Sequence, residues 1–247
     1  MLLKTKAIVL KTLKYSENKY IIDLLTETEG RVSVVINIPK TSKGKLKKQY
    51  FQLMNLLEVD LDFRQKETLQ HLRDVRMAYP YFSIPMDPYK MSITLFLAEF
   101  IYHSTRDEHE NPNLFAYIEN SMRWLDGSAG HFSNFHLVFM MRLSRFIGFF
   151  PNVDDYHEGD YFDMRNATFC SNAPLHTDFL NVDESSRIQL LMRMNYDTMH
   201  LFKMNHEDRN RIIDVLITYY RLHVPNFPEL QSLPVMKALW EIAPAKS

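Results

Sequence analysis

The sequence predicts an α+β protein with two domains, a closed five-stranded β-barrel over residues 1–80 and an all-helical domain over residues 81–247. Three observations lead to this fold class. Apolar residues alternate with polar ones in the first 80 residues, and a proline-punctuated segment, residues 79–88, ends that pattern. From Tyr89 onward, apolar residues recur every three or four positions, which is typical of helices.

The strands of the first half are read from period-two alternation. Val32, Val34 and Ile36 alternate with more polar neighbours, as do Leu57 and Val59. Such alternation indicates half-buried antiparallel strands. Five short strands hide their edges most economically by closing into a small barrel of the OB type. The expected strands cover residues 6–13, 20–26, 31–38, 57–64 and 69–77.

The second half is expected to be helical with one insertion. A helix starts near Tyr89, and Asn111 with Pro112 supplies the cap and first position of the next. Gly148 is expected to end a third helix. That third helix is expected over residues 132–146, and the remaining helices over 183–200, 206–223 and a short stretch after Pro234. The insertion, residues 152–180, is expected to hold a small hairpin around Arg165, Asn166 and Ala167.

Several function classes are excluded by composition. The chain has six glycines and neither a G-x-G-x-x-G turn nor a Walker loop. Its single cysteine, Cys170, allows no internal disulfide and no multi-cysteine zinc site. No apolar run approaches the roughly 20 residues of a membrane span, and none resembles a signal peptide. We therefore expect a cytoplasmic protein without membrane contact.

No active site is predicted. Asp126, Ser128 and His131 are close in sequence, but a catalytic triad is assembled from distant segments, so a connection between helices is the better interpretation. The acidic insertion offers His157, Cys170 and His176 as zinc ligands, yet their spacing fits no compact pattern. An acidic, solvated loop is the favoured interpretation. We expect no catalytic residue, no metal and no cofactor.

Charge is distributed unevenly along the chain. Residues 1–80 carry 15 Lys/Arg and 9 Asp/Glu, whereas residues 81–247 carry 14 and 21. Much of the positive excess comes from one acid-free segment, residues 39–48, with five lysines. Such a segment is either a plain solvated loop or a contact for a polyanion, and composition alone does not decide between them.

Four segments resemble the bacterial RecO family of DNA repair and recombination mediators. They are residues 6–31 (KAIVLKTLKYSENKYIIDLLTETEGR), 113–125 (NLFAYIENSMRWL), 139–151 (FMMRLSRFIGFFP), and 219–224 (YYRLHV) followed by 230–235 (LQSLPV). The similarity is collinear over nearly the whole chain. It implies an N-terminal OB fold and a C-terminal helical domain, the same architecture that periodicity predicts.

The resemblance also implies a function without catalysis. Members bind single- and double-stranded DNA, anneal complementary strands, work with the ring-forming partner RecR, and recognise the acidic tail of single-strand-binding protein, which helps a recombinase load. Many members carry a four-cysteine zinc element after the helix end that corresponds to Gly148 and Pro151. This chain has only Cys170 there, so the insertion at about 152–180 is expected to replace the zinc element.

These considerations select candidate binding residues. The DNA contact is expected on the lysine segment next to Arg31, or alternatively on Lys11, Lys14 and Lys19. The lysines of the segment are Lys40, Lys43, Lys45, Lys47 and Lys48. Arg142 and Arg145 are candidates for the acidic partner tail, unless they pair with the domain's own acids. Two other functions stay open: an OB-fold module that binds RNA or protein, and a metal-dependent hydrolase that uses the insertion.

Overall fold

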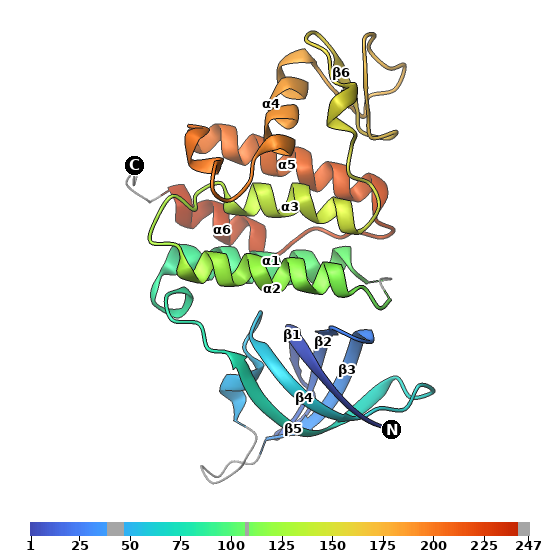
Figure 1. Ribbon diagram of the computed structural model, residues 1–247, viewed down its shortest axis with the longest axis vertical. Helices are drawn as coiled ribbons and strands as arrows, with labels where there is room; N and C mark the ends of the chain where they lie inside the picture. Colours follow the sequence, from blue (N-terminus) through green and yellow to red (C-terminus); the bar gives the residue numbers. More distant parts are fainter. Residues whose placement is uncertain (39–46, 107–108, 242–247) are drawn as a thin grey trace. The chain divides into compact units, whose positions relative to one another are not determined.

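The computed structural model describes residues 1–38, 47–106 and 109–241, which fall into two compact units (Figure 1). One unit comprises residues 1–127 together with 230–236. The other comprises residues 128–229 together with the described residues from 237 onward. In the part of the chain that is described, no helix is long and apolar enough to span a bilayer.

The first unit contains the expected closed barrel. Its strands are paired in the order β1-β2-β3-β5-β4, and β1 closes the ring by pairing with β4. Only the β3–β5 pair is parallel. The strands lie within a few residues of the expected ranges, except that β1 begins four residues earlier. Their bounds are Leu2–Lys14 (β1), Lys19–Thr26 (β2), Gly30–Asn37 (β3), Leu56–Asp62 (β4) and Leu69–Tyr79 (β5).

Alternation fills the barrel interior with apolar side chains. Val34 and Leu57 belong to its buried core cluster, as do Ala7 and Val9 of β1. A register shift at Leu10 interrupts the pairing of β1 with β2. Ile8 and Leu10 are buried as well but lie outside that core cluster, and β1 is the strand that packs against helix α1, Pro88–Ser104. Strand β1 is therefore apolar on both faces around its midpoint.

Polar side chains cap the helices of the first unit, at Asn111 as the sequence predicts and also at Asp87. The Asp87 carboxylate accepts the Tyr89 amide at 2.8 Å at the start of α1. The Asn111 side-chain oxygen accepts the Leu114 amide at 3.0 Å and begins α2, Pro112–Gly127. Residues 230–236 join this unit through Glu99 of α1, whose carboxylate accepts two backbone amides at the start of α6, Ser232–Glu241.

The carboxylate of Asp126, at the end of α2, holds the segment between β5 and α1. It accepts the backbone amides of Phe82 (3.0 Å), Ser83 (2.8 Å) and Ile84 (2.9 Å), and the Tyr79 hydroxyl donates to it at 3.3 Å. Burial raises the pKa of this carboxyl, but the hydrogen bonds outweigh burial and hold the pKa below its ordinary value. Asp126 therefore has a structural role, which agrees with the expected connection between helices.

The second unit contains α3 (Phe135–Phe146), α4 (Val182–Arg193) and α5 (His206–His223). The Tyr220 hydroxyl of α5 donates to the Met140 carbonyl of α3 at 2.7 Å, inside the core. Helix α3 ends before Gly148, whose φ of 92° favours glycine, as expected. Helix α3 starts at Phe135 rather than Phe132. The side-chain amide of Asn134 donates to the carbonyls of Met199 and Phe202, and these contacts hold the backbone before Phe135 outside the helix.

The helix expected over residues 183–200 is too long, since α4 ends at Arg193. Met194 is extended (ψ 147°), and the Asn195 side chain accepts the Thr198 amide at 2.8 Å, which favours a turn. The Tyr196 ring stacks on Phe135 with centroids 4.8 Å apart. Tertiary packing and a local polar turn thus outweigh the helical spacing of the apolar residues. Between α4 and α5 the chain forms the short 3₁₀ helix Met199–Leu201 instead.

The insertion forms the expected hairpin, with Ala167 at φ 55° in its turn. Its strands are β6 (Tyr161–Asp163) and β7 (Thr168–Cys170). A third strand, β8 (Phe179–Leu180), pairs with the other side of β6 and was not expected, because two residues carry no readable periodicity. The insertion is therefore a small sheet with β6 at its centre.

Replacing Asp126 by Ala is expected to lower the free energy of unfolding by about 2–4 kcal/mol at pH 7, because several donors lose a charged acceptor. Since folding lowers this pKa, its stabilisation is full above about pH 4 and is lost as the pH falls through the folded-state pKa. Urea unfolding at several pH values measures both effects.

The control for this change is Asp74→Ala, which removes an exposed carboxylate on β5 of the same unit. Asp74→Ala should leave stability nearly unchanged. A difference between wild type and Asp126→Ala that stays constant from pH 7 to pH 3 would contradict the role of the ionised carboxylate.

Candidate nucleic-acid interface

The cations on the outer face of β1, β4 and β5 are paired with acids. Lys4 lies 3.3 Å from Asp60 across the β1–β4 pair. Arg73 of β5 donates to Asp62 of β4 at 2.6 Å. A third pair on the same face joins Arg76 to Glu58. This face therefore carries little net charge and does not account for the positive excess of the first 80 residues.

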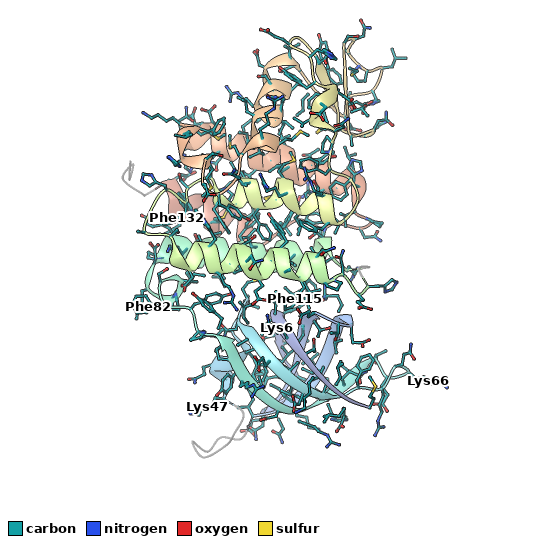
Figure 2. The ribbon with its side chains drawn as sticks, in the orientation of Figure 1. Lys6, Lys47, Lys66, Phe82, Phe115 and Phe132 are labelled. Carbon is teal, nitrogen blue, oxygen red and sulfur yellow. The ribbon has the colours of Figure 1, made fainter. Side chains whose placement is uncertain are left out.

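Lys6 is also committed to a structural contact. Its ammonium lies 3.1 Å from the Glu119 carboxylate of α2, which accepts Arg123 at 2.6 Å on its other side. Figure 2 shows Lys6 at the end of the barrel that faces α2 and Lys47 at the opposite end. The lysine at one end of the barrel, Lys6, is thus paired with an acid, whereas Lys47 at the other end is exposed.

Three segments meet at the end that carries Lys47. The Ile38 amide, just after β3, donates to the Asn18 carbonyl of the β1–β2 turn at 2.8 Å. The Thr12 hydroxyl of β1 donates to the Phe51 carbonyl at 2.7 Å, and so fixes the 3₁₀ helix Lys48–Phe51 beside β1. This end of the barrel is therefore formed by the β1–β2 turn, the end of β3 and that 3₁₀ helix.

Four exposed lysines gather on these segments. They are Lys14 and Lys19, on either side of the β1–β2 turn, and Lys47 and Lys48, at the start of the 3₁₀ helix. Within residues 1–38, 47–106 and 109–241, none of these four forms an ion pair. We call them the lysine end of the barrel. The predicted Lys40, Lys43 and Lys45 lie outside the described residues.

Arg31 and Lys11 do not join the lysine end. The Arg31 guanidinium donates to the Tyr102 carbonyl of α1 at 2.8 Å and lies 4.5 Å from the centre of the Tyr102 ring. The Lys11 ammonium lies 4.6 Å from the same ring centre. Arg31 and Asn37 are six residue steps apart on β3, a distance of about 20 Å along a strand. The end of β3 that leads into the lysine segment is therefore not next to Arg31. Because Lys40, Lys43 and Lys45 lie outside the described residues, their expected position beside Arg31 stays a prediction.

The electrostatic surroundings of Arg31 fit a partly buried structural cation. Burial lowers the pKa of Arg31, whereas Asp23 on β2 raises it. Burial also lowers the pKa of His103, with Glu99 opposing and Lys11 contributing to that decrease. Tyr102 lies at the centre of the contacts of Arg31 and Lys11, and no local sequence pattern predicts this role, because the contacts join segments far apart in the chain.

The two arginines proposed for a partner tail both have intramolecular contacts. The Arg142 guanidinium donates to the Met194 carbonyl through Nε (2.9 Å) and Nη2 (2.6 Å), at the end of α4. Arg145 is exposed and lies 4.3 Å from the centre of the Phe150 ring. Neither contact is with an acid. Their role in partner binding stays a prediction.

The three candidate zinc ligands of the insertion point to different partners. His176 lies 3.3 Å from the Asp163 carboxylate, and the His157 side chain is 82% exposed beside Asp160. The Cys170 sulfur faces the Tyr161 carbonyl at 3.8 Å. Burial, with Asp163 and Asp160 nearby, raises the pKa of the Cys170 thiol. Among the described residues, no group of three or more His, Cys, Asp or Glu could hold a metal ion.

Aromatic packing connects the small sheet to α5. The Phe162 ring contacts Phe169 at a centroid distance of 5.0 Å and Tyr219 of α5 at 5.8 Å. Tyr156 packs edge-on against Phe169 at 5.1 Å. Phe162 is 2% exposed. These rings therefore pack at the centre of the insertion.

Comparisons with known proteins match both halves of the chain. The family described as "Recombination protein O N terminal" matches residues 1–81, and "Recombination protein O C terminal" matches residues 85–233. A DNA repair protein RecO of Phocaeicola vulgatus is 50% identical over 240 residues, covering 97% of this chain and all of that protein. DNA repair protein RecO of Bacteroides fragilis is 49% identical, covering 98% of this chain, and that of Flavobacterium johnsoniae is 30% identical, covering 97%.

For the insertion, we expect Phe162→Ala to lower stability by about 3–5 kcal/mol, because it leaves a cavity among packed rings. We expect dialysis against a chelator to leave the melting temperature unchanged. Thermal unfolding and zinc analysis of the purified protein measure the two effects. Leu175→Ala is the control, since Leu175 lies in the same insertion and is fully exposed. One zinc per chain that survives the chelator would show that the insertion is a metal site.

Proposed function

Because the chain belongs to the recombination protein O (RecO) family of DNA repair proteins, we propose that it binds single- and double-stranded DNA, anneals complementary strands and helps a recombinase load. The DNA at that stage is coated with single-strand-binding protein. In this proposal the protein is a nucleoid-associated mediator that uses neither catalysis nor a cofactor. Residues 1–80 act as the DNA-binding domain and residues 81–247 as the helical domain.

The observation that carries this proposal is the set of unpaired lysines at the lysine end. Elsewhere on the barrel, Lys4 and Lys6 are neutralised by acids, whereas Lys14, Lys19, Lys47 and Lys48 are exposed and without an ion pair in the described parts of the chain. An unpaired ammonium can neutralise a phosphate without first breaking an internal contact. The proposed interface therefore lies at this end, continuing into Lys40, Lys43 and Lys45.

Lysine contacts imply a particular kind of DNA binding. An ammonium on a flexible chain interacts with phosphate as a point charge and does not read base edges. Binding should therefore tolerate any sequence, which is what annealing of arbitrary complementary strands requires. Arg31 and Lys11 are secondary candidates, because both already contact Tyr102.

Two partners are part of the proposal. They are the ring-forming protein RecR and the acidic C-terminal tail of single-strand-binding protein, with Arg142 and Arg145 as candidates for the tail. Arg145 is the better candidate of the two, because it is exposed, while two nitrogens of Arg142 bind the end of α4. An RNA- or protein-binding OB module is the alternative, and annealing assays with RNA and DNA strands separate the two.

We expect the quadruple variant Lys43→Ala, Lys45→Ala, Lys47→Ala, Lys48→Ala to bind single-stranded DNA more weakly and with less salt dependence. If five lysines neutralise phosphates, log K should fall against log salt with a slope of roughly −3.5, from about −0.7 per contact. The variant should flatten that slope towards about −1 and slow annealing. Fluorescence anisotropy over a salt series measures the slope.

A charge-matched control separates a local contact from overall charge. Lys66→Glu combined with Lys203→Glu removes the same four units of positive charge at exposed positions away from the lysine end. This control should keep a slope near the wild-type value. Equal affinity and slope for the quadruple variant and wild type would move the DNA contact away from residues 43–48.

For the partner tail, Arg145→Glu should weaken binding of a peptide with the acidic tail sequence at least several-fold, since it replaces attraction by repulsion. Isothermal titration measures the affinity, and an unchanged melting temperature shows that the fold is intact. Arg193→Glu, an exposed arginine at the end of α4, is the matched control. If both variants bind the peptide as wild type does, the α3 surface is not the tail site.

A further inference from the structure

The β1–β2 turn exposes a tyrosine, Tyr15, at the lysine end of the barrel. Its side chain is 70% exposed, and in the described parts of the chain it has no hydrogen bond, ion pair or ring contact. Two other tyrosines of the barrel, Tyr20 and Tyr50, are partly buried and pack against the barrel core. Tyr15, in contrast, is not part of the packing of the barrel core.

The backbone beneath Tyr15 is fixed. The Tyr15 amide donates to the Lys19 carbonyl at 2.9 Å, and the Ser16 amide donates to the same carbonyl at 3.1 Å. The Asn18 carbonyl accepts the Ile38 amide at 2.8 Å, which attaches the turn to the end of β3. A ring on a fixed turn loses little backbone entropy when a flat ligand packs on it.

Cations flank Tyr15 in the sequence and belong to the other segments of the same barrel end. Lys14 precedes it directly, Lys19 closes the turn, and Lys47 and Lys48 begin the adjacent 3₁₀ helix, against one acid, Glu17, in the turn. Phosphate contacts and a free π-face are the two requirements for binding single-stranded nucleic acid without sequence preference.

The other exposed aromatic side chain among the described residues lacks such surroundings. Phe82 is 87% exposed, but it lies in the segment between β5 and α1, where its backbone amide donates to the Asp126 carboxylate. No exposed lysine is next to it in sequence. The combination of an exposed ring with unpaired lysines is therefore specific to Tyr15.

We propose that Tyr15 is a stacking platform for an unpaired nucleobase, and that the lysine end holds the phosphates on either side of that base. This inference rests on the proposed DNA binding and deepens it. Bases in a duplex are paired and stacked on each other, so they offer no free face to Tyr15. The tyrosine therefore strengthens binding to single strands but not to duplexes, while the lysines serve both.

The test compares three probes with the full-length protein: an oligo-dT strand, an abasic strand of equal length and charge, and a duplex. Stacking on one aromatic ring corresponds to a loss of about 5- to 100-fold in affinity when the ring is removed. We expect Tyr15→Ala to show this loss on oligo-dT only, with the affinities for abasic strand and duplex within about twofold of wild type. Tyr15→Phe should restore binding to oligo-dT.

Two further readouts distinguish stacking from charge or misfolding. The salt slope on oligo-dT should be the same for Tyr15→Ala and wild type, because no phosphate contact is removed. The melting temperature should be unchanged, since the ring is exposed. Phe82→Ala, which removes an equally exposed ring elsewhere in the unit, should leave all three affinities unchanged.

Distinct outcomes overturn the inference and the function it rests on. If Tyr15→Ala binds oligo-dT as wild type does, while the quadruple lysine variant loses affinity, the stacking platform is wrong and the DNA-binding proposal stands. Equal losses on oligo-dT and the abasic strand would likewise exclude stacking. If wild type binds none of the three probes, both proposals fail.

Discussion

The carboxylate of Asp126 fixes the point at which the barrel passes into helices. Strand β5 ends at Tyr79 and α1 begins at Pro88, so the eight residues 80–87 turn the chain from one to the other. The three consecutive amides from Phe82 to Ile84 have no strand partner, and a single charged acceptor satisfies them. With this turn fixed, α1 lies against β1 and buries Ile8 and Leu10 on its outer face. The barrel is thereby closed on one side by a helix of its own unit.

That arrangement separates the cations of the first unit by role. Next to α1 and α2, Arg31 and Lys11 pack on Tyr102, and Lys6 pairs with Glu119. At the other end of the barrel, no helix among the described residues of the unit supplies an acid to Lys47, which is exposed. A count of charges along the sequence does not distinguish these lysines and this arginine from one another. Only their partners distinguish a cation that holds the fold together from one that can bind a phosphate.

The fold was largely predictable because its signals are local. Period-two alternation in β3 and β4 and the caps at Asn111 and Gly148 depend on neighbours within a few residues. The differences arise where distant contacts decide the local structure. Helix α4 stops at Arg193 because the Asn195 turn and the Tyr196 ring on α3 outweigh helical spacing. The same reason explains the site: sequence identified the lysines, but the contact of Arg31 with Tyr102 joins distant segments and depends on α1.

The lysine end combines two attractions for nucleic acid, one from its lysines and one from the exposed ring of Tyr15. Lysines attract any nucleic acid, paired or unpaired, and their contribution falls with salt. An exposed ring such as Tyr15 adds an attraction that salt does not screen and that only an unstacked base can satisfy. On such a surface the ring favours unpaired strands, whereas the lysines bind strands and duplex alike. Annealing on such a surface converts bases that contact the protein into bases that contact each other, so the duplex keeps only the phosphate contacts. In the proposed function, the loss of the stacking contact would favour release of the annealed product.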